Sequence, residues 1–367
     1  MGWLRFYYDR RIFLVERITM MFSCVAYTEA MRDEWDRFAS SKGTIFHTTA
    51  FRQVLLSSFG YKCLYHAVLD KQGRICAILP LVAGRNLGLK KAGVSLPFVN
   101  YTDICASGEE AFQYAVEVVA GIRERHRLSY VELRLKEQHI DNGNWSANLH
   151  NHTFVLPLEE DEEKVLALSS SSNRNHVRKV YKNNWFDVSY DKSQLERFYR
   201  VYVIRMKQLG SPAPDIRFFQ SFFDHLPEHS HLLTVLDREN GDVVGGMLLL
   251  TSPGDSTLYY PYGANLPQYN HKYLNNFMYW EAVRFGIGNG LKQLDLGRSQ
   301  TGSGTYKYKQ QWGAKPQQLR YVTYTGGTQG AGAPDKTNLS LFVELWKVTP
   351  GFITRAVGKR LIPYIMP

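Results

Sequence analysis

The 367-residue sequence has few cysteines, and their placement argues against metal binding and disulfide bonds. None belongs to a CxxC pair, and no histidine follows them at the spacing of a zinc site. The histidines also lack ligand spacing among themselves, so the sequence predicts no metal ion. We expect four reduced cysteines of a cytosolic protein: Cys24, Cys63, Cys76 and Cys105.

Long apolar runs are also missing. No stretch reaches the roughly 18 consecutive apolar residues that a membrane-spanning helix needs. In residues 1–20, Glu16 and Arg17 interrupt the only apolar stretch, which disfavours a signal peptide. Clear patterning begins near Met21, so residues 1–20 are expected to be an N-terminal arm or to precede the natural start. We therefore expect a cytoplasmic protein, with any contact at the inner membrane being peripheral.

Several catalytic signatures are absent. There is no GxxxxGK[ST] loop for nucleotide phosphates, no GxSxG nucleophile turn and no HExxH metal motif. Acetyl-CoA-dependent acetyltransferases carry a glycine-rich R/Q-x-x-G-x-G/A loop between a strand and a helix. The nearest counterpart, residues 84–88, leads into no predicted helix. Acetyl-CoA is therefore a less favoured acyl donor, other acyl thioesters stay open, and no bound cofactor is predicted.

The composition is that of a folded protein with an excess of basic residues. Hydrophobic residues make up 44% and charged residues 21%, and the length exceeds what one core usually serves. Two packed units are the natural expectation. The net charge of +10 favours an anionic partner such as nucleic acid, lipid headgroups or a phosphorylated substrate, although basic enzymes without such a partner are common.

An internal repeat indicates the fold class. Two β-rich runs joined by a glycine-containing turn occur at residues 68–81 and again at residues 235–250. A helix-like segment followed by a short strand occurs at residues 111–134 and again at residues 274–296. Because both events recur in the same order at similar offsets, the chain is predicted to contain two copies of one unit. The class is α/β (α+β), each unit being a mixed, mostly antiparallel sheet covered by helices.

The two predicted units span residues 21–156 and 157–325. Residues 326–337 are rich in glycine and are predicted to be a flexible linker. Residues 338–367 are predicted to form a C-terminal helical tail with a basic, amphipathic helix. That helix either docks on the body with solvated basic residues or contacts a membrane surface through residues 350–362.

The end of the second unit resembles a known family. Residues 308–313, Tyr-Lys-Gln-Gln-Trp-Gly, are similar to the aromatic-Lys-x-x-aromatic-Gly signature near the end of FemAB-like proteins. Residues 173–180 resemble the basic helix that opens the second lobe of that family, and residues 79–81 with 95–101 resemble part of its first lobe. The resemblance is closest to the subgroup associated with exosortase and exopolysaccharide systems.

The resemblance implies two tandem GNAT-like domains with a cleft at their junction. It also implies transfer of an amino acid from aminoacyl-tRNA to an amine of a peptidoglycan precursor. The sequence departs from the family in two ways. The helical hairpin that some relatives insert for tRNA has no counterpart, and Asn100 stands where relatives carry Asp.

The lead hypothesis is therefore an acyl- or aminoacyltransferase that acts on an amine or hydroxyl of a peptidoglycan or exopolysaccharide precursor. Its partners would be an aminoacyl-tRNA or acyl-thioester donor and a phosphorylated or lipid-linked envelope precursor. A non-catalytic assembly protein at the membrane surface and a tRNA-binding module are the alternatives. DNA is not an expected partner.

Acyl transfer from an ester to an amine needs aligned reactants and a hydrogen-bond donor for the developing oxyanion. Lys309, flanked by aromatic residues, fits that donor by its chemistry and by the resemblance, although its stem could simply cover Trp312. Asp103 could take a proton or hold the amine, or merely start a turn. Arg298 could clamp a phosphate or carboxylate before the glycine-rich turn at residues 302–304.

The other candidates form two groups. Arg174, Arg178 and Lys182 recur every fourth residue and would form a basic stripe on one helix face, for a phosphate-rich partner or simply for solvent. The predicted substrate-binding residues are Arg298, Ser303, Gly304, Tyr306, Trp312, Tyr260, Tyr262, Asn100 and Tyr101. The ordinary alternatives are a helix cap at Ser303 and core packing for the tyrosines.

Overall fold

The computed structural model describes residues 21–140, 143–327 and 336–366. The predicted N-terminal arm, residues 1–20, and most of the predicted linker, residues 326–337, lie outside the described residues. Within the described parts of the chain, every helix is too short or too polar to cross a bilayer.

The described strands form two mixed sheets of eight strands each, which confirms the predicted α/β class. The first sheet contains β1 (Ser23–Ala26), β2 (Lys62–Leu69), β3 (Ile75–Arg85), β4 (Lys91–Ser95), β5 (Cys105–Ala106), β6 (Tyr130–Leu135), β7 (Trp145–Asn148) and β16 (Arg320–Tyr324). The second contains β8 (Asn151–Pro157), β9 (Phe186–Ser189), β10 (Ser230–Asp237), β11 (Val243–Ser252), β12 (Thr257–Asn265), β13 (Gln293–Asp295), β14 (Ser299–Gln300) and β15 (Lys315–Gln318).

The two sheets repeat one strand order. The first runs β1-β2-β3-β4-β6-β16-β7, and the second runs β9-β10-β11-β12-β13-β8 with β15 on the outer side of β8. Each has one parallel pair at its centre, β4 with β6 and β12 with β13. The two predicted hairpins are β2–β3 and β10–β11. The internal duplication inferred from the sequence is thus present in the hydrogen-bonding pattern.

The sheets also exchange one strand each. β16, from the end of the second unit, lies between β6 and β7 of the first sheet. β8, which precedes the second unit, lies between β13 and β15 of the second sheet. The predicted boundary between residues 156 and 157 therefore falls at the end of a strand that already belongs to the second sheet. Hydrogen-bonding partners, rather than order along the chain, decide where a strand belongs.

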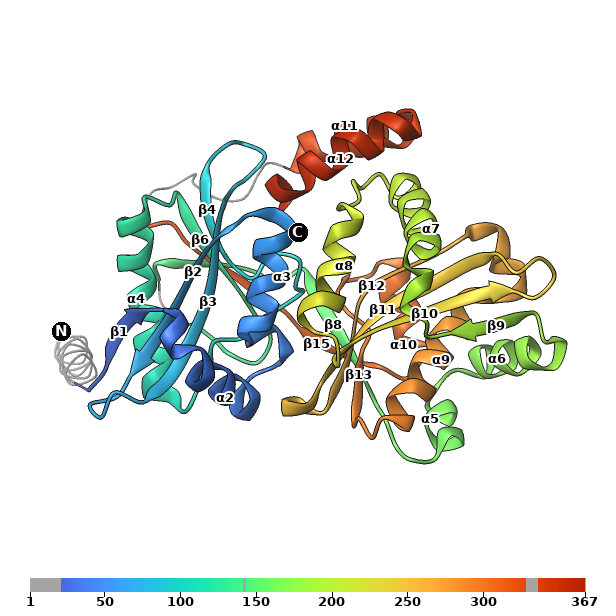
Figure 1. Ribbon diagram of the computed structural model, residues 1–367, viewed down its shortest axis with the longest axis horizontal. Coiled ribbons are helices and arrows are strands. Elements are labelled where there is room, and N and C mark those ends of the chain that lie inside the picture. Colours follow the sequence, from blue (N-terminus) through green and yellow to red (C-terminus); the bar gives the residue numbers. More distant parts are fainter. Residues whose placement is uncertain (1–20, 141–142, 328–335, 367) are drawn as a thin grey trace, which may run out of the picture.

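Helices cover both faces of each sheet. The first lobe has α2 (Arg32–Lys42), the short η2 (Ile45–His47), α3 (Thr49–Phe59) and α4 (Glu109–His126). The second has α5 (Glu162–Leu168), α6 (Ser171–Asn183), α7 (Leu195–Gln208), α8 (Ile216–His225), α9 (Leu274–Gly288) and α10 (Gly304–Gln310). α3 packs against α8, which brings the two lobes side by side (Figure 1).

The ends of α3 show why its sequence forms a helix with these bounds. Thr48 accepts a hydrogen bond from the backbone N–H of Phe51 and so caps the first turn. Gly60 ends the helix in the left-handed conformation that glycine adopts at low cost. The buried face of α3 then joins an aromatic core between the lobes, where Phe98 stacks on Phe59 at 4.3 Å.

The C-terminal tail consists of two helices, α11 (Lys336–Val348) and α12 (Gly351–Ile365), where one basic amphipathic helix was predicted. Pro350 separates them, because it cannot donate the backbone hydrogen bond that would continue α11. Both helices contact α7, and α12 also contacts β3. The tail therefore bridges the two lobes along one side of the molecule (Figure 1).

Proline in the exchanged strand β16 should be far more costly than proline at its edge neighbour. Buried Val322 pairs with Leu133 of β6 and Ala147 of β7. We expect Val322→Pro to lower the free energy of unfolding by at least about 3 kcal/mol, because a central strand loses a ladder bond. Ala147→Pro, directly opposite on the edge strand, should cost less. Urea denaturation followed by tryptophan fluorescence measures both, and equal costs would contradict a central place for β16.

Candidate functional site

Two parallel strands of the second lobe separate at the candidate site. β12 pairs with β13 only as far as Tyr259 and Asp295, and then runs on to Asn265 without it. Just beyond this point a register shift against β11 places Tyr260 and Pro261 in a β-bulge. Proline is tolerated there because a bulge interrupts the ladder that would need its N–H. The strands thus diverge and leave space between them.

A loop of the first lobe closes this space. In this loop Leu96 and Phe98 have positive φ angles of 55° and 69°, which are uncommon for residues other than glycine. The surroundings hold that backbone in place, because Phe98 stacks on Phe59 and its carbonyl oxygen accepts a hydrogen bond from Tyr262 Oη at 2.6 Å. Strained backbone that its neighbours over-determine is typical of binding sites.

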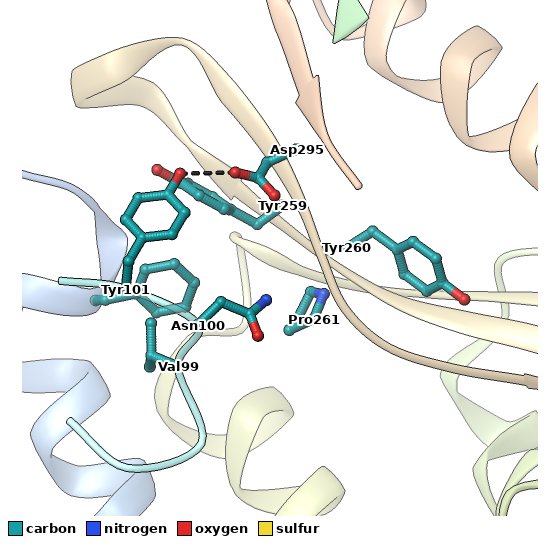
Figure 2. Close-up of a pocket in the computed structure, with 8 residues that line it drawn as sticks. Val99, Asn100, Tyr101, Tyr259, Tyr260, Pro261 and Asp295 are labelled. Carbon is teal, nitrogen blue, oxygen red and sulfur yellow. Dashed lines mark hydrogen bonds between the residues drawn. The ribbon is translucent and has the colours of Figure 1, made fainter. Parts of the chain in front are cut away.

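A narrow pocket lies where the loop meets the diverging strands (Figure 2). Its volume of ≈ 10 Å³ admits little more than one water molecule. Figure 2 shows the Tyr101 hydroxyl directed at Asp295, whereas the ring of Tyr260 points away from the other lining residues. The pocket is lined by Phe46, Val99, Asn100, Tyr101, Tyr259, Tyr260, Pro261 and Asp295.

Asp295 is the carboxylate of this pocket, and its side chain is held by both lobes. Oδ2 accepts a hydrogen bond from Tyr101 Oη at 2.7 Å. Oδ1 accepts from Thr153 Oγ1 at 2.8 Å and from the backbone N–H of Gly297 at 2.6 Å. Asp295 is only 2% exposed, and a buried charge requires such donors. A carboxylate has about four acceptor positions, so one remains for a ligand.

The hydroxyl of Tyr101 stays protonated in this setting. Burial, and then the neighbouring charge of Asp295, raise the pKa of Tyr101 well above its usual value. A neutral tyrosine can donate its hydrogen bond to the carboxylate over the whole physiological pH range. Tyr101 therefore fixes the orientation of Asp295 from the opposite lobe.

Lys309 supports the turn that follows Asp295. Its ammonium donates hydrogen bonds to the carbonyl oxygens of Gly297 at 2.9 Å and Arg298 at 3.1 Å. Burial lowers the pKa of Lys309 to about 8, although the charge of Asp295 acts in the opposite direction. Lys309 does not line the pocket. Lys309 thus holds the turn in this structure, and the oxyanion contact predicted from the sequence stays a prediction.

A second chain of hydrogen bonds links the turn to the loop of the first lobe. Arg298 Nη1 donates to Tyr321 Oη at 3.1 Å, and Tyr321 Oη donates to the carbonyl oxygen of Asn100 at 2.5 Å. The side-chain amide of Asn100 has no hydrogen-bond partner among the described residues and points toward Pro261 (Figure 2). Asn100 therefore brings a free donor and a free acceptor to the pocket.

Asp103, predicted as catalytic, does not line the pocket, and its contacts are with the backbone of the first lobe. Its carboxylate accepts hydrogen bonds from the backbone N–H groups of Lys136 at 2.8 Å and Glu137 at 3.3 Å. Its carbonyl oxygen accepts from His47 Nε2 at 2.7 Å. Burial raises the pKa of Asp103, and the backbone donors oppose that rise. Asp295 was not among the residues predicted from the sequence, although a charged residue between two leucines of a short strand is itself a sign of an unusual buried carboxylate.

Other predicted substrate-binding residues shape the second lobe rather than the pocket. Trp312 is buried in its core, and Tyr306 packs edge-on against Phe154 at 4.8 Å. Ser303 accepts a hydrogen bond from the backbone N–H of Tyr306 and so caps α10, whose first residue is Gly304. Ser303 thus caps a helix and the aromatic side chains pack in the core, which are the two alternatives to substrate binding given for these residues. The structure brings Asn100, Tyr101 and Tyr260 to the pocket, and places Tyr262 and Arg298 on its supporting contacts.

The predicted basic stripe exists on α6, away from the residues that line the pocket. Arg174 donates a hydrogen bond to the carbonyl oxygen of Ser169, and Arg178 forms an exposed ion pair with Glu163 at 3.4 Å. Lys182 is exposed. Two of the three charges are thus already engaged.

Within the described residues, no group of three or more acidic, histidine or cysteine side chains could hold a metal.

A wider groove of ≈ 560 Å³ lies beside the pocket, on the other side of η2. Phe46 of η2 lines the pocket, and the preceding Ile45 lines the groove. The opposite wall comes from the α8–β10 connection of the second lobe, including Glu228 and His229. Both hollows thus lie at the junction of the lobes.

The second lobe matches a known family. Residues 171–310 match the family model described as an acetyltransferase (GNAT) domain. No curated protein matches the sequence. Among solved structures, the fold is similar to that of FemX, with a TM-score of 0.62 and 14% identity over 88% of this chain and 100% of that chain.

Two further structures repeat this similarity. L-PGS from Bacillus licheniformis gives a TM-score of 0.55 at 12% identity, covering 86% of this chain and 97% of that chain. A tandem GNAT protein from the clavulanic acid biosynthesis pathway gives 0.51 at 9% identity, covering 86% and 100%. The fold is a tandem GNAT fold. The predicted resemblance to FemAB-like proteins is confirmed at the level of this fold.

Removing the Tyr101 hydroxyl should destabilise the junction of the two GNAT-like lobes. Tyr101→Phe leaves the buried carboxylate of Asp295 one donor short, so we expect a loss of about 1.5–3 kcal/mol in the free energy of unfolding. Tyr65→Phe is the matched control, because the buried hydroxyl of Tyr65 has no partner among the described residues. The Tyr65→Phe substitution should be neutral or stabilising. Urea unfolding measures the free energy of unfolding of both variants, and equal losses would contradict the proposed contribution of the Tyr101–Asp295 hydrogen bond to stability.

Proposed function

We propose that this chain is an acyl- or aminoacyltransferase that acts on an amine or hydroxyl of a peptidoglycan or exopolysaccharide precursor. The site is the pocket between the lobes. The observation that carries the proposal is the buried Asp295 carboxylate, held by donors from both lobes where β12 and β13 separate. The GNAT match of residues 171–310 and the FemX-like fold support a transferase. The proposal extends to the exosortase- or exopolysaccharide-associated FemAB-like branch and to the cytoplasmic face of the inner membrane.

The pocket offers each contact that acyl transfer needs. The acceptor amine or hydroxyl attacks the acyl carbon, the bond to the leaving oxygen or sulfur breaks, and the acceptor's proton ends on the leaving group. Asp295 binds the acceptor N–H or O–H at its unoccupied position and receives the proton in passing. The free amide of Asn100 donates to the carbonyl oxygen as negative charge develops there. Tyr101 holds Asp295 in place.

The parts around the pocket suit larger reactants. Arg298 is exposed at the edge of the site and uses one of its donors on Tyr321, so its other donors can bind a phosphate of either reactant. The groove of ≈ 560 Å³ beyond η2 has room for the body of a glycan or peptide precursor. A reacting group that enters the pocket would need the loop around Phe98 to move, which its strained backbone makes less costly.

The connection before α9 bears on the acyl donor. Residues 266–273 lead from β12 into α9, begin with Leu-Pro and contain no glycine. A glycine-rich turn would let backbone N–H groups approach a pyrophosphate closely. We therefore favour aminoacyl-tRNA or an acyl-carrier thioester over acyl-CoA as the donor, with the basic stripe on α6 as an auxiliary contact for nucleic acid.

The test is transfer from labelled donors by the purified protein. Charged bulk tRNA, acyl-CoA and acyl-carrier thioesters are supplied separately with nucleotide-linked muramyl peptides or lipid-linked saccharides as acceptors. We expect transfer from one donor class, and a loss of at least about 100-fold with Asp295→Asn. Asp242→Asn, on an exposed turn, is the control and should retain the rate. Salt-sensitive tRNA binding without transfer would indicate a tRNA-binding module instead, and silence with every donor would favour an assembly protein.

The charge of Lys309 should appear in the pH dependence. Because its pKa lies at about 8, the ammonium that holds the turn is lost as pH rises above that value. An arginine keeps its charge, so the ratio of wild-type to Lys309→Arg rates should fall about tenfold per pH unit above 8. The ratio cancels the titration of the acceptor amine. A flat ratio would contradict the positioning role.

The folding stability that Lys309 affects should rise with pH over this range, whereas the rate ratio falls. The folded-state pKa of Lys309 is below its unfolded value of about 10.4, so the folded state binds fewer protons between these values. The free energy of unfolding of the wild type, relative to Lys309→Met, should therefore rise from pH 8 toward pH 10. Urea titrations at each pH measure this difference.

A further inference from the structure

The tail helix α12 is firmly held along one narrow side. Thr354, Gly358 and Ile362 are buried at every fourth position and face the body. A side chain on Gly358 would meet Pro212 and the Trp346 ring at 3.4 Å, so the packing is close. The carbonyl oxygen of Pro363 accepts a hydrogen bond from Tyr61 Oη at 2.7 Å, and that of Met366 accepts one from Arg134 at 2.8 Å. These contacts fix the rotation of α12 about its axis, and therefore which of its side chains face solvent.

One side of that outer surface is apolar. Ile353, Val357 and Tyr364 are exposed, and at 100° per residue they lie together on one side of the helix, about 120° from the buried positions. Val348, at 78% exposure, and Phe352, at 68%, add exposed apolar side chains at the junction of α11 and α12. A helix on the surface of a globular protein normally turns its polar face outward. Contiguous exposed apolar side chains of this kind mark an interaction surface.

Basic side chains flank the patch. Arg355, Lys359 and Arg360 of α12 are exposed beside it. Among residues 342–366 the sole acidic side chain is Glu344, and it is neutralised by Lys347 at 2.7 Å. Lys359 lies 4.0 Å from the carboxylate of Asp215 on the body, whereas Arg355 and Arg360 have no ion pair among the described residues. The patch thus combines apolar side chains with a positive rim. This combination is complementary to an anionic bilayer, where apolar side chains enter the interface and cations contact lipid headgroups.

We propose that the face of α11–α12 formed by Val348, Phe352, Ile353, Val357 and Tyr364 docks the protein on an anionic membrane surface. Docking would orient the body with the tail against the bilayer and leave both lobes in solution. The inference concerns the membrane location named in the proposed function, but its observations come from the tail alone and do not depend on the transferase activity. An anionic lipid surface, rather than a protein partner, is favoured by the positive rim.

Vesicle sedimentation tests the proposal with the full chain. We expect binding to phosphatidylcholine vesicles that contain phosphatidylglycerol and little binding to phosphatidylcholine alone. The double variant Val348→Ser with Phe352→Ser should weaken binding at least about tenfold, because it removes the most exposed apolar side chains. Leu89→Ser is the matched control, since Leu89 in the β3–β4 turn is 64% exposed, close to the value for Phe352. It should bind like the wild type.

Charge is tested separately. Arg360→Glu should weaken binding to anionic vesicles at low salt, whereas Lys71→Glu, in the exposed β2–β3 turn, should not. Equal binding to neutral vesicles, or binding unchanged by the serine variants, would overturn the proposal. So would a concentration-dependent dimer, seen by light scattering, that Phe352→Ser abolishes, because a second copy would then cover the patch. Transfer to a soluble acceptor does not require membrane docking. Measuring this transfer alongside vesicle binding therefore separates a failure of the docking proposal from a failure of the proposed function.

Discussion

The exchange of β8 and β16 is the constraint on which the rest of the structure depends. Each strand occupies a central position in a sheet whose other strands come mostly from the other half of the chain. Neither sheet is complete alone, so the relative position of the lobes is fixed by two backbone ladders as well as by side-chain packing. Sliding one lobe past the other would break central hydrogen bonds in both sheets.

The same two strands build the candidate site. Thr153 of β8 donates to Asp295, and Tyr321 of β16 donates to the backbone of Asn100. The Asp295 carboxylate and the loop that faces it are therefore each supported by the strand that crosses over from the other half. Lys309 adds a third support by holding the turn after Asp295. These supports hold the Asp295 carboxylate and the backbone of Asn100 in place.

Much of the fold could be predicted because its signals are local. The glycine-containing turns of β2–β3 and β10–β11, and the helices before β6 and β13, follow from short-range periodicity, and their repetition indicated the duplication. The helix-like segment predicted within residues 274–296 corresponds to α9. Strand exchange left no such signal, because a strand's sequence shows that it pairs but does not identify its partner.

The site was predicted only in part for the same reason. The sequence by itself determined the tandem GNAT-like class, the tail and several pocket residues, among them Asn100, Tyr101 and Tyr260, because motif and pattern lie within short stretches. Only the tertiary structure decided that Asp295 rather than Asp103 is the pocket carboxylate, and that Lys309 supports a turn. Those roles depend on which donors surround each group after residues far apart in the chain have met, and burial and hydrogen bonding are properties of that arrangement.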